Sequence, residues 1–251
     1  MTVPAESAAD LRGKVVIVTG SSSGIGAATA RRLAGLGASI VVNSARSAEA
    51  GQRLAAELGD SSYVQGDIGS PDTAVRLVQA AVERWGRLDG LVNNAGKTIA
   101  VPLHDLENVT ADQFADVLRV NVIGSFLVTQ QALPHLREVG GWVINITSIA
   151  GLRQLGSSLP YAVSKAALNH LTTILAKFAG GGVRVNAVAP GLVDTPWTQT
   201  WDLQRQAVAA AAPLRRIATP EDVAEACVGL IANPYITGQV ITVDGGLTLT
   251  A

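Results

Sequence analysis

Three side chains in the second half of the sequence could together carry out acid and base chemistry on a carbonyl group. Tyr161 and Lys165 are four residues apart, so a helix would place them on one face, one turn from each other. The tyrosine pKa is ordinarily about 10, and the lysine charge would lower it by favouring the phenolate. Ser148 could donate a hydrogen bond to the carbonyl oxygen. This set suits hydride transfer to a ketone, whose oxygen gains charge and then a proton.

A Tyr-x3-Lys pair alone also fits an ordinary amphipathic helix, so its meaning depends on the rest of the chain. Asn121 lies within a long helical pattern, although asparagine is a mediocre helix former. The residues alone suggest a buried polar group bonded to a neighbouring carbonyl.

A glycine-rich segment near the start of the chain could hold a phosphate group. Residues 19–26, TGSSSGIG, lie between a short apolar run and an Ala-rich stretch. Glycines allow a tight turn and a close approach to a pyrophosphate, and the N–H groups at the start of a helix favour an anion. On its own the segment is weak evidence, because such glycines can serve only a turn.

These residues need elements that bring them together, and the hydrophobic pattern predicts alternating strands and helices. Continuous apolar strands separated by helices indicate an α/β fold with a doubly wound parallel sheet of about seven strands in a single domain, residues 1–251. The expected strands are Lys14–Thr19, Ser39–Asn43, Tyr63–Gln65, Leu88–Val92, Trp142–Ile146, Val183–Val188 and Val240–Val243. The expected helices are a stretch ending at Leu36, Ala48–Leu58, Pro71–Trp85, Ala111–Arg137 broken by Pro134, Tyr161–Phe178 and Glu221–Ile231.

Residues 192–216 contain an Ala run and two tryptophans but no strand pattern, and we expect a mobile lid over the substrate. Trp197 and Trp201 could cover an apolar substrate or could pack as a small separate core.

In order and spacing, these segments resemble the short-chain dehydrogenase/reductase family over about residues 12–248. Residues 19–26 match its TGxxxGIG signature, residues 93–96 (NNAG) follow the fourth predicted strand, and Pro190-Gly191 follows the sixth. The resemblance implies a Rossmann-type fold and a catalytic tetrad of Asn121, Ser148, Tyr161 and Lys165, in which Asn121 links Lys165 to a chain of waters.

The resemblance also implies a bound nicotinamide dinucleotide. Asp67 matches the family's adenine-contacting acid and Thr195 matches the threonine that contacts the nicotinamide amide. The predicted cofactor-binding residues are Gly20, Ser22, Ser23, Gly24, Ile25, Gly26, Ser44, Arg46, Asp67, Ile68, Asn94, Ala95, Gly96, Tyr161, Lys165, Pro190, Gly191, Val193 and Thr195.

The region after the second predicted strand favours NADP(H) over NAD(H). Folds that prefer NAD place an acid there to bind the ribose hydroxyls, whereas this chain has no acid until Glu49. Arg46 could pair with a 2′-phosphate, although it could also be a solvated surface charge. Many NADP-preferring relatives add a basic residue in the glycine turn, where this chain has Ser23.

The predicted function is an NADP(H)-dependent ketone reductase or alcohol dehydrogenase, similar to carbonyl reductases. A 3-oxoacyl-[acyl-carrier-protein] reductase is the alternative, and basic residues at the mouth of the site would favour it; the candidates are Arg153, Arg215 and Arg216. An apolar pocket would favour a small ketone, and the candidates are Leu152, Leu155, Leu192 and Trp197. A non-catalytic nucleotide-binding protein is a more remote alternative. The resemblance further suggests a homotetramer.

The composition limits the class of protein. Hydrophobic residues make up 48% of the chain and charged residues 16%, which argues against disorder. The net charge of −1 without a basic stripe argues against nucleic acid and membrane as partners. No apolar leader opens the sequence, and the single Cys227, expected in the core, fits a reducing compartment, so we expect a cytoplasmic protein. The dispersed His104, His135 and His170 do not predict a metal site.

Overall fold

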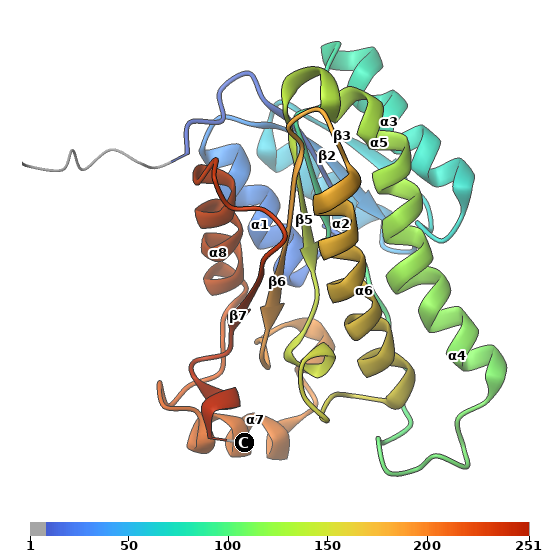
Figure 1. Cartoon of the computed structure of the whole chain (residues 1–251), viewed down its shortest axis with the longest axis vertical. Coiled ribbons are helices and arrows are strands. Elements are labelled where there is room, and N and C mark those ends of the chain that lie inside the picture. The colour runs from blue at the N-terminus through green and yellow to red at the C-terminus, as the bar shows by residue number, and fades with distance from the viewer. Residues whose placement is uncertain (1–8, 251) are drawn as a thin grey trace, which may run out of the picture.

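Seven parallel strands form one sheet in the order β3-β2-β1-β4-β5-β6-β7 (Figure 1). The computed structural model describes residues 9–250, so residues 1–8 and 251 of the predicted 1–251 domain lie outside the described residues. The strands are β1 Val15–Val18, β2 Ser39–Ser44, β3 Ser61–Gln65, β4 Gly90–Asn93, β5 Trp142–Ile146, β6 Arg184–Pro190 and β7 Val240–Val243. The prediction of a Rossmann-type α/β fold with a seven-stranded parallel sheet is confirmed.

Helices cover both faces of the sheet. They are α1 Gly24–Gly35, α2 Ala48–Leu58, α3 Pro71–Trp85, α4 Ala111–Leu118, α5 Ser125–Val139, α6 Leu159–Phe178, α7 Asp202–Ala211 and α8 Pro220–Ala232. In Figure 1, α1 and α8 pack together on one side of the sheet, and α5 and α6 lie on the other. None of the helices within residues 9–250 has both the length and the apolar character that a bilayer span requires.

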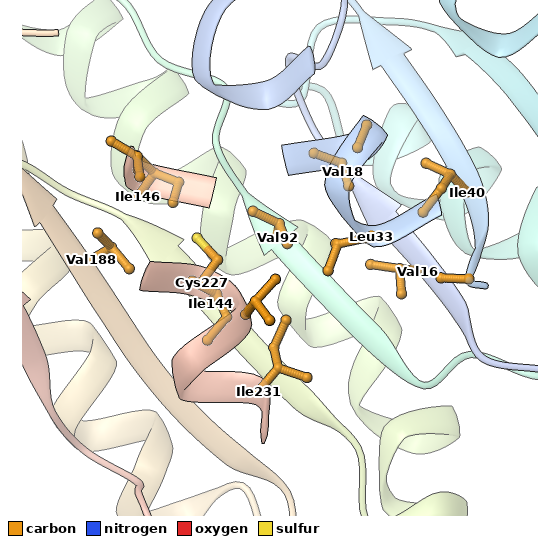
Figure 2. Close-up of a cluster of buried hydrophobic side chains, with 14 of the residues drawn as sticks. Val16, Val18, Leu33, Ile40, Val92, Ile144, Ile146, Val188, Cys227 and Ile231 are labelled. Carbon is orange, nitrogen blue, oxygen red and sulfur yellow. The ribbon is translucent and has the colours of Figure 1, made fainter. Parts of the chain in front are cut away.

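Two apolar clusters, one on each face, hold these layers together. One joins the sheet to α1 and α8, and Figure 2 shows Leu33, Cys227 and Ile231 from these helices against Val16 and Ile144 of the strands. The other joins the sheet to α3, α5 and α6. Burying a large aliphatic side chain contributes about 1.5–3 kcal/mol. Cys227 is fully buried, as predicted, and burial raises the pKa of its thiol to about 12.

The strand order reverses between β1 and β4, the central pair of the sheet. The chain passes from β1 outward through β2 and β3, then returns to place β4 on the other side of β1. The connections that leave β1 and β4 therefore diverge at their carboxyl ends. In open parallel sheets such a reversal leaves the crevice in which ligands bind.

The long helix predicted over residues 111–137 is divided at a different place from the one expected. Pro134 lies inside α5, which continues to Val139, so the predicted break there is wrong. The carbonyl that loses its partner at Pro134 belongs to the exposed Gln130, where water can replace the missing N–H. The interruption instead is a π-helical segment, Arg119–Gly124, between α4 and α5.

Residues 192–216 contain no strand, as expected, but they include a helix that the sequence analysis did not predict. A short 3₁₀ turn at Pro196–Thr198 precedes α7, and no residue of α7 is buried. Helix α7 lies apart from both main helical layers, beside the C-terminal end of the chain in Figure 1.

Candidate active site

A cleft of about 1010 Å³ opens at the carboxyl ends of the strands, where the connections that follow β1 and β4 diverge. It is bordered by the ends of β2, β5 and β6 and by the loops that follow β1 and β4. All predicted cofactor-binding and catalytic residues line this cleft except Gly26 and Asn121. These two lie directly behind its wall, as described below.

The glycine turn leaves the first N–H groups of α1 available to an anion. Ser23 occupies the N-cap position in an extended conformation, and its side chain makes no capping hydrogen bond. The first turn of α1 contains no acidic residue. An uncapped helix start of this kind favours a phosphate group, both by its free N–H donors and by its dipole.

Two glycines of the turn are required by the packing around it. Gly20 has φ of +61°, and a Cβ atom there would lie 2.7 Å from the Cα of Ala95. A Cβ on Gly26 would lie 2.4 Å from Nδ2 of Asn94. The Asn94 amide uses this space to donate hydrogen bonds to the carbonyl oxygens of Thr19 (2.9 Å) and Gly20 (3.0 Å). Because Gly26 has no side chain, it leaves room for the Asn94 amide, which joins the ends of β1 and β4.

Arg46 and Asp67 line the cleft after β2 and β3, and the end of β2 is hydrogen-bonded to the glycine turn through Asn43. The Arg46 side chain is exposed and follows β2, where a 2′-phosphate would need a cation. The Asp67 carboxylate accepts hydrogen bonds from Nη2 of Arg119 at 2.8 Å and from the Gly69 N–H at 2.9 Å. Burial raises the pKa of Asp67, but these bonds outweigh it and the net pKa lies below its usual value. This cleft fits a dinucleotide, with an anion site at the start of α1 and the cationic Arg46 after β2.

Helix α6 brings Tyr161 and Lys165 to the same wall of the cleft. It starts early, at Leu159, because the buried Ser158 caps it by accepting the Tyr161 N–H at 3.3 Å. Nζ of Lys165 lies 5.6 Å from the centre of the Tyr161 ring and donates a hydrogen bond to the Ile146 carbonyl at 2.8 Å. Lys165 is only 3% exposed, and burial lowers its pKa to about 8.

Ser148, at the end of β5, is the third group on this wall. Its Oγ accepts the Ala150 N–H at 3.1 Å, and its side chain lines the cleft together with that of Tyr161. Burial raises the pKa of Tyr161, and the Ser148 hydroxyl lowers it by less. The sequence analysis expected Lys165 to lower this pKa, but in the structure desolvation of the phenol is the larger effect. The phenol is therefore protonated at neutral pH and can act as an acid.

Asn121 lies in the π-helical segment and is fully buried. Its Oδ1 accepts the Lys97 N–H at 2.8 Å, and its Nδ2 donates to the Lys97 carbonyl and to Oγ of Ser164, both at 2.9 Å. Within the π turn, the Asn121 carbonyl accepts a hydrogen bond from the Ser125 hydroxyl at 3.1 Å. Insertions of this type are frequent at functional sites, since they redirect one side chain within a helix. Here Asn121 holds the backbone of Lys97, in the loop that follows β4.

Several cleft residues were missed by the sequence analysis. Lys97 and Asp116 form an ion pair, and Arg119 joins Asp116 to Asp67. Thr98 and Ser157 also line the cleft. The position of Lys97 directly after the NNAG segment was the one available signal. The others come from segments that meet only in the folded chain.

The lid segment provides an apolar wall beside Tyr161. The rings of Trp197 and Tyr161 are 5.9 Å apart between centroids and meet edge to face at 73°. Trp197 remains 44% exposed, and it lines the cleft with Trp201, Leu155 and Leu192. Of the two roles considered for the tryptophans, this position favours covering a ligand over forming a separate core.

The arginines considered for the mouth of the site do not line the cleft. Arg216 is paired with Asp222, and Arg215 donates to the Ala210 carbonyl. Arg153 is exposed and donates to the carbonyl of Leu152 at 3.1 Å. Across residues 9–250, His, Cys, Asp and Glu side chains form no group of three or more that could hold a metal ion.

Known proteins are similar to this chain over nearly its whole length. The family model described as Enoyl-(Acyl carrier protein) reductase matches residues 20–248. A Streptomyces violaceoruber protein, described as ketoacyl reductase 2 of the granaticin polyketide synthase, is 52% identical over 94% of this chain and 96% of its own. The cis-4-hydroxycyclohexanecarboxylate dehydrogenase of Sinomonas cyclohexanicum is 37% identical over 94% and 96%. A crystal structure from Burkholderia xenovorans, described as a short-chain dehydrogenase/reductase, is 37% identical, covers 94% of this chain and 98% of its own, and superposes with a TM-score of 0.88.

Proposed function

The chain belongs to the short-chain dehydrogenase/reductase family, an oxidoreductase family acting on carbonyl and alcohol substrates, and from this premise we propose that it is an NADP(H)-dependent ketone reductase. The observation that carries the proposal is the meeting of Ser148, Tyr161 and Lys165 on one wall of the cleft that begins at the glycine turn. Oxidation of a secondary alcohol uses the same groups in opposite roles.

In the proposed mechanism, Tyr161 is the general acid for ketone reduction. Its hydroxyl donates a proton to the carbonyl oxygen as negative charge develops there, and the Ser148 hydroxyl donates a hydrogen bond to the same oxygen. The Lys165 ammonium stabilises the phenolate that remains. Asn121 holds the Lys97 backbone beside this group and, by family resemblance, belongs to the path by which the proton is replaced.

Residues of the glycine turn, with Asn94 and Thr195, are proposed to hold the dinucleotide across the strand ends. When bound, the nicotinamide supplies or accepts the hydride. The uncapped start of α1 would hold the pyrophosphate, and Arg46 would pair with a 2′-phosphate. The exposed Arg46 in the cleft lining supports NADP(H) over NAD(H).

The cleft wall supports a ketone with an apolar body as substrate. Leu155, Leu192 and Trp197 border the cleft, whereas the fourth apolar candidate, Leu152, does not. The arginines Arg153, Arg215 and Arg216 do not border it either. A second candidate, a 3-oxoacyl thioester reductase, is favoured by the relative described as a polyketide ketoacyl reductase. Both candidates use the same chemistry and differ in what the ketone carries.

The test is the loss of NADPH absorbance, with NADH in parallel, across small ketones, ketoesters, sugars and a 3-oxoacyl thioester. Activity with one class of ketone and a preference for NADPH would support the proposal. Tight cofactor binding without turnover of any ketone would instead support the non-catalytic nucleotide-binding alternative.

We further propose a single catalytic domain that forms a homotetramer in the cytoplasm. Apolar side chains stand exposed along α6, with Ile174 at 42% and Phe178 at 67%, which supports burial between subunits. The single, buried Cys227 fits a reducing compartment. Light scattering on an eluting size-exclusion peak tests the subunit number.

A further inference from the structure

Three hydroxyl groups beside Tyr161 form a cluster that the proposed mechanism does not use. Oγ1 of Thr98 lies 2.7 Å from Oγ of Ser157 and 2.9 Å from Oγ of Ser158. Thr98 belongs to the loop after β4, and the serines lie just before Tyr161 on α6, about 60 residues later in the chain. Residues so far apart in the sequence come into contact only when the chain is folded.

Proton counting shows that the cluster has hydrogen-bonding capacity to spare. Ser158 is fully buried and its Oγ accepts the Tyr161 N–H, and its contact with Thr98 uses one hydroxyl proton, whichever of the two atoms donates it. The contact between Thr98 and Ser157 uses a second proton. For the third proton, residues 9–250 offer one further acceptor, the Ile99 carbonyl, which lies 3.4 Å from Oγ1 of Thr98 at the long limit of a hydrogen bond. A hydroxyl with a free donor or acceptor can pair with either a carbonyl or a hydroxyl group.

The cluster lies close to the place where the reacting carbonyl must lie. Thr98 and Ser157 line the same cleft as the Tyr161 side chain. The backbone leading to Ser157 runs along the phenol ring, since a Cβ atom on Gly156 would lie 3.7 Å from Cδ1 of Tyr161. The polar cluster therefore stands beside the catalytic tyrosine, within a cleft whose lid side is lined by Trp197.

We propose that Thr98 and Ser157 form a subsite for a second oxygen of the substrate. The substrate class is then a ketone that also carries a hydroxyl, keto or ester oxygen near the reacting carbonyl. This inference rests on the proposed function and specifies its substrate. The neighbouring Lys97 ammonium is paired with Asp116, so the group that matches the subsite is a neutral oxygen rather than a carboxylate.

The test compares two ketones of equal chain length, ethyl 3-oxobutanoate and 2-heptanone, which differ in the second oxygen function. The rate constants kcat/KM are measured by NADPH absorbance, and dissociation constants are measured by calorimetry in the presence of NADP⁺. The variants are Ser157→Ala and Thr98→Val, with Thr98→Ser to restore the hydroxyl. Gln154→Ala is the matched control, because Gln154 is exposed and lies outside the cleft.

We expect Ser157→Ala and Thr98→Val each to lower the ratio of kcat/KM between ketoester and ketone by about tenfold, the effect of one lost hydrogen bond. The ketoester dissociation constant should rise in parallel, while Thr98→Ser and Gln154→Ala keep the wild-type ratio. The comparison of this ratio between variant and wild type also cancels the difference in intrinsic reactivity between the two carbonyl groups.

The outcomes separate this inference from the proposed function. Turnover of both ketones with an unchanged ratio in Ser157→Ala and Thr98→Val overturns the subsite and leaves the reductase proposal standing. Ketoester binding that depends on Ser157 but leads to no turnover supports the subsite and contradicts the reductase. Failure of the ketoester to bind the wild-type protein overturns the subsite.

Discussion

The Lys165 ammonium lies 5.6 Å from the centre of the Tyr161 ring, and both side chains line the cleft, where Lys165 is almost fully buried. Burial shifts the two pKa values in opposite directions, because it disfavours whichever form is charged. It lowers the pKa of Lys165 to about 8 and raises the pKa of Tyr161 above its ordinary value. As pH rises through about 8, the lysine therefore loses its charge while the phenol keeps its proton.

The pH dependence of ketone reduction should follow Lys165. We expect kcat/KM of the wild type to decline as pH rises through about 8, because the charge that stabilises the phenolate is lost. In Lys165→Arg the cationic group is misplaced, so activity should fall about 100-fold. Because the guanidinium stays charged over this pH range, the decline with pH should be absent. Initial rates from pH 6 to 10 with one ketone check both statements. The same decline in wild type and variant would assign it to another group.

Arg46 should decide the preference for NADPH. Arg46→Ala removes the cation proposed to pair with the 2′-phosphate, and we expect the dissociation constant for NADPH to rise about tenfold or more, with that for NADH nearly unchanged. The matched control is Arg53→Ala, because Arg53 is exposed on α2 and is paired with Glu49. Fluorescence titration with both cofactors provides the measurement. Equal weakening of NADPH and NADH would contradict the role given to Arg46.

Two glycines of α1 should respond to alanine in opposite ways. A Cβ on Gly26 would meet Nδ2 of Asn94 at 2.4 Å and the Gly20 carbonyl oxygen at 2.6 Å, whereas a Cβ on Gly35 meets nothing within 4 Å. We expect Gly26→Ala to lower the free energy of unfolding by about 1–3 kcal/mol and to weaken cofactor binding. Gly35→Ala should raise it by about 0.5 kcal/mol. Urea denaturation measures both, and equal stabilities of the two variants would show that the turn tolerates a side chain.

The sheet could be predicted well because its strands are continuous apolar runs between polar turns. The bounds predicted for β5 and β7 agree with the structure, and those of the other strands differ by a few residues at most. The glycine turn and the order of the motifs then predicted which strand ends would border the site. The local sequence was sufficient for the strands because the residues that form the apolar runs are also the residues that the sheet needs.

The remaining features depend on contacts that a local pattern does not contain. Asn121 interrupts a helix because its amide is held by the backbone of Lys97, 24 residues earlier. Pro134 was expected to break the helix, but tertiary packing keeps α5 helical on both sides of it. Helix α7 buries none of its residues, so its apolar pattern gave little signal. The cluster of Thr98 with Ser157 joins residues 59 apart whose types have many ordinary uses.

The central claim is that Tyr161 transfers the proton, and Tyr161→Phe tests it most directly. The variant keeps the ring that contacts Trp197 and removes only the hydroxyl. With a ketone that the wild type reduces, we measure NADPH oxidation by the two proteins and the NADPH affinity of each. We predict a loss of kcat of about 1000-fold with NADPH affinity unchanged within about twofold. A variant that keeps most of the wild-type kcat would contradict the assignment of Tyr161 and the mechanism built on it.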